Sequence, residues 1–299
     1  MILAITGGTG FVGRRLIDRA LAAGHQVRAL TRRPQPPRDG VSWIEGALDT
    51  PAPLVTLMTG ADAAIHVAGV VNAPDREGFA AGNIEGTRAM AAAAFVAGVP
   101  HLVHVSSLAA REPDLSVYGW SKAGAEDAVM TSGLGWTIVR PPAVYGPGDR
   151  DMIDVYRLAA KGLAVIPSRG MMSAIHVDDL ADALLALAAA PPAHATYEVE
   201  GSDGPMTQAA YVRAIGNAVG RRVRVIAPPV ALLSLAARGD RLLRGANAKL
   251  TPDRAAYLAH DDWAVDPARR VPAAVWRPRI GVAEGLADTA AWYRAHGLL

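Results

Sequence analysis

The stretch Thr6-Gly7-Gly8-Thr9-Gly10-Phe11-Val12-Gly13 decides the fold expected of this chain. It follows a short apolar, strand-like run and opens the segment 11–23, in which apolar residues recur at helical spacing. In this strand–turn–helix context Gly7 permits the tight turn, Gly10 lets the backbone approach a pyrophosphate, and Gly13 lets the helix pack closely on the sheet. The free N–H groups and the positive dipole end of that helix attract phosphates. The motif therefore predicts a dinucleotide site with contacts from Gly7, Thr9, Gly10, Phe11, Val12 and Gly13.

The composition is that of a globular chain. Of its 299 residues 51% are hydrophobic and 19% are charged, which allows a large buried core in one or two α/β domains. The net charge of +2 is slight and the arginines are spread along the chain, so we expect no nucleic-acid partner. Met1 runs directly into the first strand, and no uncharged apolar run reaches about 18 residues. We therefore expect a cytoplasmic protein without a membrane span.

No metal site is expected. The chain has no cysteine, which excludes disulfides, thiol catalysis and thiolate metal ligands. Its eight histidines show no spacing that would bring them together with carboxylates on one face of a helix or strand.

The first 140 residues alternate strands and helices. Strands are expected at 2–6, 26–31, 41–45, 63–67, 101–106 and 136–140, and helices at 11–23, 79–97 and 118–132. This alternation implies a parallel sheet covered on both faces, whose ligands bind beyond the carboxyl ends of the strands. We therefore predict an α/β fold: a Rossmann-type doubly wound parallel sheet with a smaller, discontinuous C-terminal substrate lobe.

After residue 140 the pattern loosens into short pieces separated by prolines. We expect residues 1–145 to form the dinucleotide-binding domain, with returns near 174–199, and residues 146–299 to form mainly the substrate-binding lobe. The stretch 230–244 mixes leucines and arginines, so it could lie on an acidic membrane surface, but a helix of the substrate lobe is the interpretation that we favour.

Tyr118 and Lys122 form a second group with chemical potential. They lie four residues apart, so they share one face of the predicted helix. An ammonium group close by favours the phenolate and lowers the tyrosine pKa from about 10. Ser106 and Ser107 end the preceding strand, where a hydroxyl group could donate a hydrogen bond to a carbonyl oxygen beside Tyr118. Such a group of residues can protonate an oxygen while a hydride arrives from a nicotinamide.

With these features the chain resembles the extended short-chain dehydrogenases/reductases, a superfamily that includes NAD(P)-dependent epimerases and dehydratases. The resemblance spans nearly the whole chain. It is carried by the motif 6–13 and by the segments 83–87, 105–107, 118–122, 140–148, 176–181 and 276–278, with Gly285.

The resemblance implies roles for individual residues. Tyr118 would be the general acid/base, Lys122 would hold the nicotinamide ribose and lower the tyrosine pKa, and Ser107 would be the catalytic serine. Asn83 matches a position that can support a proton relay, although it could equally be a polar residue at a helix start that ties backbone together. The further cofactor contacts expected are Ala68, Lys122, Pro141 and Val144.

The end of the second strand bears on the choice of cofactor. NAD enzymes usually place an acidic residue there, which accepts hydrogen bonds from the adenosine ribose. This chain has Thr31-Arg32-Arg33-Pro34 instead, and Arg14 follows the glycine motif directly. The pair Arg32 and Arg33 would bind a 2′-phosphate through charge-assisted hydrogen bonds, the alternative being a solvated basic turn. We therefore favour NADP(H) over NAD(H).

Two departures from the sugar-nucleotide enzymes of this superfamily bear on the substrate. Leu108 and Ala109 follow Ser107, where dehydratases usually carry acidic residues, and only ten residues separate Ser107 from Tyr118. The segment 171–175 lacks the arginine that commonly contacts a diphosphate. An apolar carbonyl or alcohol is therefore the expected substrate. Its pocket could be lined by Met152, Met171 and Met172, although methionines more often belong to the hydrophobic core.

Two other functions stay open. An epimerase would use the same Tyr118 and would need a basic diphosphate pocket, for which Arg213, Arg221 and Arg222 are the candidates. The second alternative function is that of a non-catalytic NADPH-binding sensor or assembly protein. Relatives of that kind tend to lose the tyrosine–lysine pair, which this chain keeps. The resemblance also makes a homodimer possible.

Overall fold

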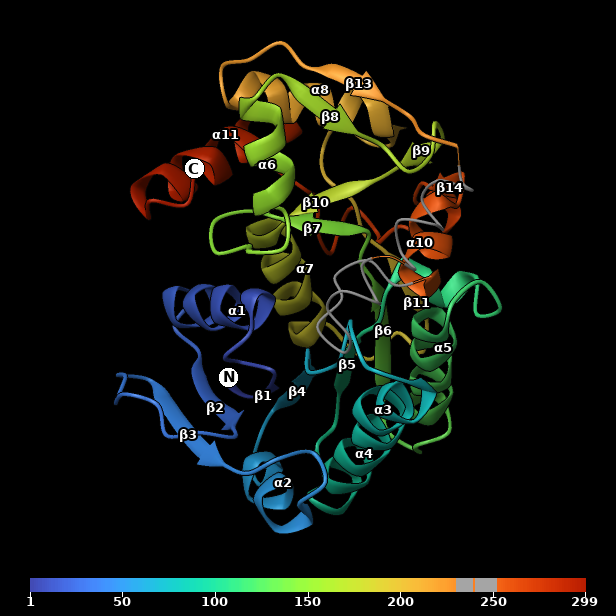
Figure 1. Cartoon of the computed structure of the whole chain (residues 1–299). Coiled ribbons are helices and arrows are strands. Elements are labelled where there is room, and N and C mark those ends of the chain that lie inside the picture. The colour runs from blue at the N-terminus through green and yellow to red at the C-terminus, as the bar shows by residue number, and fades with distance from the viewer. Residues whose placement is uncertain (230–238, 240–251) are drawn as a thin grey trace. The chain divides into compact units, whose positions relative to one another are not determined.

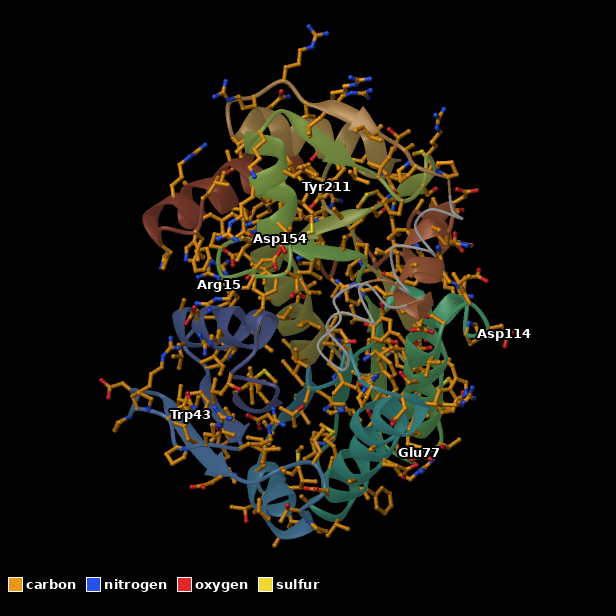
Figure 2. All side chains as sticks on the ribbon, viewed as in Figure 1. Arg15, Trp43, Glu77, Asp114, Asp154 and Tyr211 are labelled. Atoms are coloured by element: carbon orange, nitrogen blue, oxygen red, sulfur yellow. The ribbon has the colours of Figure 1, made fainter. Side chains whose placement is uncertain are left out.

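The computed structural model describes residues 1–229, 239 and 252–299 (Figure 1), and Figure 2 adds their side chains. The stretch 230–244, apart from Gly239, lies outside the described residues, so its interpretation as a helix stays a prediction. None of the helices in the described ranges is long and apolar enough to cross a membrane.

The chain divides into two compact units. Unit 1 comprises Met1–Pro141, Leu180–Val199 and Ala268–Arg277, and unit 2 comprises Pro142–Asp179, Glu200–Pro267 and Pro278–Leu299. The functional assignment of 1–145 to the dinucleotide and of 146–299 to the substrate stays a prediction.

Unit 1 is built on a seven-stranded sheet in which every neighbouring pair is parallel, in the order β11-β6-β5-β4-β1-β2-β3. The predicted doubly wound parallel sheet is thereby confirmed. Its strands are β1 (Ile2–Thr6), β2 (Gln26–Thr31), β3 (Val41–Glu45), β4 (Ala63–His66), β5 (Leu102–Val105), β6 (Trp136–Arg140) and β11 (Thr196–Glu198).

The helices of this part of the chain are α1 (Phe11–Ala22), α2 (Pro51–Met58), α3 (Arg76–Phe79), α4 (Gly86–Val96), α5 (Val117–Met130) and α7 (Val177–Ala189). Helix α2 was not predicted. It begins with proline at its first position, where a backbone N–H would have no hydrogen-bond partner within the helix and its absence therefore costs nothing. The helix expected at 79–97 is interrupted by a π-helical turn, Ala80–Glu85, and a short 3-10 helix, Leu108–Arg111, follows β5.

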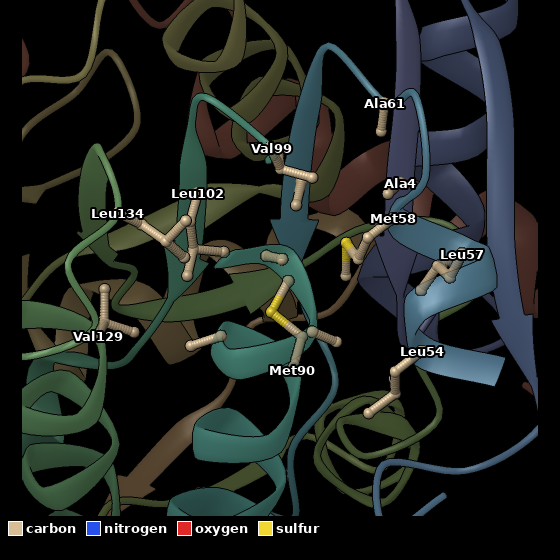
Figure 3. Close-up of a cluster of buried hydrophobic side chains, with 14 of the residues drawn as sticks. Ala4, Leu54, Leu57, Met58, Ala61, Met90, Val99, Leu102, Val129 and Leu134 are labelled. Atoms are coloured by element: carbon tan, nitrogen blue, oxygen red, sulfur yellow. The ribbon is translucent and has the colours of Figure 1, made fainter. Parts of the chain in front are cut away.

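A hydrophobic core fills the space between the sheet and helices α2, α4 and α5 (Figure 3). Helix α4 packs against both of its neighbours, and Met90 at its centre is completely buried. The core side chains include Leu54, Leu57 and Met58 from α2, Leu102 from β5 and Val129 from α5. Their burial fixes the helices on the sheet.

The described residues of unit 2 form three small sheets. Strand β7 (Ala143–Tyr145) pairs with β10 (Ala174–His176), β9 (Met171–Met172) lies between β12 (Met206–Thr207) and β14 (Asp262–Trp263), and β8 (Leu163–Val165) pairs with β13 (Arg224–Ile226). Of the stretch 174–199, β11 therefore joins the main sheet, whereas β10 pairs with β7.

The helices described in unit 2 include α6 (Ile153–Ala160), α8 (Gln208–Ala218), α10 (Pro252–Ala259) and α11 (Val282–Ala295). The centre of its hydrophobic core is formed by four buried tyrosines, Tyr145, Tyr156, Tyr211 and Tyr293. Met152 and Met172 pack against that core.

Candidate active site

The glycine motif forms a tight turn between β1 and α1. Gly7 has a φ of +74°, and the Gly10 N–H donates to the Gly7 carbonyl oxygen at 3.0 Å. A Cβ atom on Gly7 would lie 2.6 Å from the backbone nitrogen of Ala68, and one on Gly13 would lie 2.1 Å from the Gly7 oxygen. Both positions therefore require glycine. Gly10 is exposed, and a Cβ atom there would meet only the Gly7 oxygen, at 3.3 Å.

The N-terminus of α1 has the features of an anion site. Its N-cap, Gly10, has no side chain to accept hydrogen bonds from the first N–H groups, and its first turn carries no acidic residue. Thr9, Phe11 and Val12 are partly buried in the same turn. Arg14 donates from Nε to the Thr9 carbonyl oxygen at 2.9 Å and so holds the outer part of the motif in place.

Arg32 and Arg33 directly follow β2, whose carboxyl end lies beside that of β1 in the parallel sheet. Both are exposed. The Thr31 hydroxyl donates to the Arg33 carbonyl oxygen at 2.6 Å and accepts from the Arg33 N–H at 3.3 Å, which curls the backbone at this point. Within the described part of the chain, neither guanidinium group has an ion-pair partner.

Tyr118 and Ser107 are brought together at the carboxyl end of β5. Tyr118 lies in the first turn of α5, which is capped by Ser116, whose hydroxyl accepts from the Gly119 N–H at 3.0 Å. The Tyr118 side chain is hydrogen-bonded to that of Ser107. Burial raises the pKa of Tyr118, and the hydrogen bond with Ser107 opposes that rise. The tyrosine therefore stays protonated at neutral pH.

Lys122 is buried one turn further along α5. Its ammonium group donates to the Val105 carbonyl oxygen at 2.8 Å, at the end of β5. Burial lowers the pKa of Lys122 to about 8, and the carboxylate of Glu126 opposes this fall. The expected lowering of the Tyr118 pKa by this lysine is not seen, because desolvation of the phenol dominates and Lys122 is not among the groups that shift it.

Of the two serines, Ser106 is bound to an ion-pair network. Its hydroxyl donates to Glu126, which also accepts two hydrogen bonds from the Arg140 guanidinium, at 2.8 and 2.6 Å. A second buried carboxylate, Glu198, lies 3.9 Å from Arg140 and 3.3 Å from Arg111. The hydroxyl of Ser107 is the one that faces Tyr118.

Asn83 lies in the π-helical turn, and both the oxygen and the nitrogen of its side-chain amide form hydrogen bonds. Its side chain accepts from the Val70 N–H at 2.7 Å and donates to the Val70 carbonyl oxygen at 3.0 Å and to the Ser121 hydroxyl at 2.9 Å. Ser121 in turn donates to the Tyr118 carbonyl oxygen at 2.8 Å. These contacts tie the loop after β4 to α5, as expected of a residue that holds backbone together; a role in a proton relay stays a prediction.

Two buried histidines, His66 on β4 and His104 on β5, were given no role from the sequence. His66 bonds Thr6 through Nδ1 at 2.6 Å and Thr87 through Nε2 at 3.0 Å, and its ring stacks on that of His104 with centroids 5.2 Å apart. Burial, and next the charge of Lys122, lowers the pKa of His66 to about 3, and the pKa of His104 falls as well. Both rings are neutral. The available signal was that each histidine stands inside a predicted strand.

The remaining predicted contacts lie in three places. The Ala68 N–H faces the Thr6 hydroxyl at 3.4 Å, next to the glycine turn. The Pro141 carbonyl oxygen accepts from the Leu108 N–H at 3.1 Å, and Pro141 ends the first segment of unit 1. Val144 belongs to β7 of unit 2, where it pairs with Ile175. Among the described residues no group of three or more His, Asp or Glu side chains could hold a metal ion.

Comparison with known proteins gives three consistent matches. A family model described as NAD(P)H-binding matches residues 7–191. The chain is 39% identical to the ceramide reductase of Caulobacter vibrioides over 100% of its own length and 96% of that protein. It is also 32% identical, over 64% of its length and 66% of the relative, to the 4-hydroxy-2-methyl-3-oxo-4-farnesyl-3,4-dihydroquinoline-1-oxide ketoreductase of Stigmatella aurantiaca.

Among solved structures, that of MoeE5 in complex with UDP-glucuronic acid and NAD superposes with a TM-score of 0.75 over 99% of both chains, at 22% identity. This likeness establishes the fold.

Proposed function

The chain belongs to the NAD(P)H-binding family of the short-chain dehydrogenase/reductase superfamily, and from that premise we propose that it is an NADP(H)-dependent reductase of an apolar carbonyl compound. The observation that carries the proposal is the hydrogen bond between Tyr118 and Ser107 above the buried Lys122, at the carboxyl end of β5. This end of the sheet also holds the glycine turn after β1.

The residues present fit a dinucleotide. The uncapped N-terminus of α1 offers N–H groups to a pyrophosphate, and the open side of Gly10 leaves room for its approach. Thr9, Phe11 and Val12 would contact it from the same turn. The other contacts that we propose are Gly7, Gly13, Ala68, Lys122, Pro141 and Val144.

The catalytic step that we propose is a proton transfer by Tyr118. When bound, the nicotinamide cofactor supplies the hydride for the carbonyl carbon or accepts it in the reverse direction. Ser107 and Tyr118 donate hydrogen bonds to the carbonyl oxygen, and the Tyr118 proton moves to this oxygen as its negative charge develops. Lys122, charged below its pKa of about 8, would hold the ribose of the nicotinamide. The raised pKa of Tyr118 keeps it in the protonated form that reduction requires.

The preference for NADP(H) rests on Arg32 and Arg33. They follow β2 at the place where NAD enzymes usually carry a carboxylate, and both are exposed. A 2′-phosphate there would receive charge-assisted hydrogen bonds from two planar guanidinium groups.

The proposed substrate class is an amphiphilic ketone with a long apolar chain. Leu108 and Ala109 directly follow Ser107, where a sugar-nucleotide dehydratase would carry acids, and both are buried, so neither brings a charged group to the site. The names of the two relatives support this class, since one is a reductase of ceramide and the other a ketoreductase of a farnesyl-bearing quinoline oxide.

The test is a titration of the purified chain with NADPH and NADH, followed by NADPH oxidation with a series of ketones of increasing chain length. We expect tighter binding of NADPH, and kcat/KM that rises with chain length and is lost in Tyr118→Phe. Equal affinity for both cofactors would contradict the NADP assignment. Binding without turnover of any ketone would favour the epimerase or the non-catalytic sensor instead.

A further inference from the structure

The sheet formed by β8 and β13 exposes one face that is mostly apolar. Strands β8 and β13 pair in parallel, with Leu163 opposite Arg224 and Val165 opposite Ile226. Because paired residues of neighbouring strands point to the same side of a sheet, these four side chains share a face. Ala164, between them in sequence, points the other way and is buried in a hydrophobic cluster.

The aliphatic side chains on this face are unusually accessible. Leu163, Val165 and Ile226 are 37%, 45% and 43% exposed, whereas Ala164 in the same strand is 1% exposed. Single exposed aliphatic side chains are common on protein surfaces, but three neighbouring ones on one small sheet form a hydrophobic patch whose exposure to water is unfavourable.

Cations gather at the N-terminal end of the same strands. The Arg224 N–H donates to the Gly162 carbonyl oxygen at 2.8 Å, and a Cβ atom on Gly162 would lie 3.7 Å from the Arg222 carbonyl oxygen. Lys161, next to Gly162, Arg222 and Arg224 are all exposed. Their side chains have no carboxylate partner in the described part of the chain. We call the six residues Leu163, Val165, Ile226, Lys161, Arg222 and Arg224 the β8–β13 face.

The surrounding sequence carries one sign of charge. Residues 161–170 and 204–229 contain lysine and arginine but neither aspartate nor glutamate, in a chain whose net charge is only +2. Nitrogen-tipped side chains accordingly project from the chain around β13 and the end of α8 (Figure 2). Arg221 and Arg222, considered above for a diphosphate pocket, belong to this exposed region.

We propose that the β8–β13 face docks on the surface of an anionic phospholipid bilayer. Lipid phosphates would neutralise the cations, and the three aliphatic side chains would enter the boundary between headgroups and acyl chains. A single-stranded nucleic acid would be held by stacking on aromatic side chains, which this face lacks. The proposal concerns association and does not depend on the reaction, although it would place the protein where amphiphilic ketones dissolve.

The expected contribution of the cations is large enough to measure. A lysine or arginine near an anionic membrane strengthens binding about fivefold, so removal of all three should weaken the partition coefficient about 100-fold. The contribution of the aliphatic side chains does not depend on ionic strength. It should therefore account for most of the membrane binding that remains at about 0.5 M salt, where charges are screened beyond about 4 Å.

The experiment is co-sedimentation of the full chain with vesicles, without cofactor or substrate. Vesicles of phosphatidylcholine alone are compared with vesicles containing about 30 mol% phosphatidylglycerol. The test variant is Lys161→Gln/Arg222→Gln/Arg224→Gln. The control is Arg38→Gln/Arg88→Gln/Arg277→Gln, which removes the same charge from exposed arginines elsewhere. A third variant, Leu163→Ser/Val165→Ser/Ile226→Ser, removes the aliphatic part, and circular dichroism melts verify that every variant is folded.

We expect binding to anionic vesicles only, a loss of about 100-fold in the test variant, a change below about threefold in the control, and loss of the salt-resistant fraction in the serine variant. Three results would overturn the proposal: no sedimentation with anionic vesicles, equal losses in the test and control variants, or displacement by a single-stranded oligonucleotide that is independent of the aliphatic residues. Because no turnover is measured, these outcomes are separate from a failure of the proposed reductase activity.

Discussion

The replacement Arg32→Ala/Arg33→Ala should abolish most of the preference for NADPH over NADH that we propose. Both guanidinium groups are exposed and, within the described part of the chain, without ion-pair partners, so the substitution breaks no ion pair between described residues. A charge-assisted hydrogen bond contributes about 1.5–3 kcal/mol when it is well shielded, and exposure reduces this to about 1–1.5 kcal/mol for each arginine. Together they amount to about 2–3 kcal/mol, which corresponds to a roughly 30- to 150-fold weaker Kd for NADPH.

The assay is fluorescence titration of the wild type and the variant with NADPH and NADH at one fixed ionic strength. The Kd for NADH should change less than about threefold, because this cofactor has no 2′-phosphate to lose. Arg38→Ala is the matched control, since Arg38 belongs to the same connection but is paired with Asp18 at 2.7 Å. Equal weakening of both cofactors in the double variant would refute the reasoning, as would an equal effect of Arg38→Ala.

Three further predictions concern Tyr118, the proposed general acid, and two buried carboxylates. Tyr118→Phe should lower the rate of NADPH oxidation at least about 1000-fold and leave the Kd for NADPH nearly unchanged, because it removes the proton and not a cofactor contact. Burial raises the pKa of Asp149 to about 6, so its contribution to stability is present below the unfolded pKa of 3.8 and lost as the pH rises through 6. Asp149→Asn, whose oxygen can still accept from the Asp151 N–H, should therefore stabilise the protein by about 2–3 kcal/mol in thermal melts at pH 8 and by little at pH 4. Glu126→Gln should lower the free energy of unfolding in urea by about 2–3 kcal/mol, because it leaves the Arg140 guanidinium with a weaker, uncharged partner. An unchanged midpoint of urea unfolding would contradict the role given to this ion pair.

Most strands of the main sheet could be predicted because the signals that define a single strand lie in the local sequence. Strands β1, β2, β3 and β6 begin and end at the predicted residues, since apolar runs bounded by turn residues allow few alternatives. The position of Gly13 was equally readable, because its contact with Gly7 lies within one turn. Strands of two or three residues, such as β9, are too short for a period to be recognised, and they could not be found in this way.

The chemistry around Lys122 was only partly predictable, because it depends on contacts between distant segments. The four-residue spacing places Tyr118 and Lys122 on one helix face, but it does not show that the ammonium group turns to the Val105 carbonyl oxygen or that burial dominates the tyrosine pKa. The stack of His66 on His104 likewise follows from the register of β4 with β5, which pairs these two residues. No feature of either strand alone contains that information.

These distant contacts explain how a buried lysine keeps its charge at neutral pH. Desolvation favours the neutral amine, and a protonated His66 nearby would favour it further. Burial prevents this second effect, because it lowers the pKa of His66 to about 3 and so keeps the ring uncharged. Glu126 acts in the opposite direction, and its hydrogen bonds from Arg140 and Ser106 hold the carboxylate in place. The same network fixes Ser106 at the end of β5, so the next residue along the chain presents its hydroxyl to Tyr118.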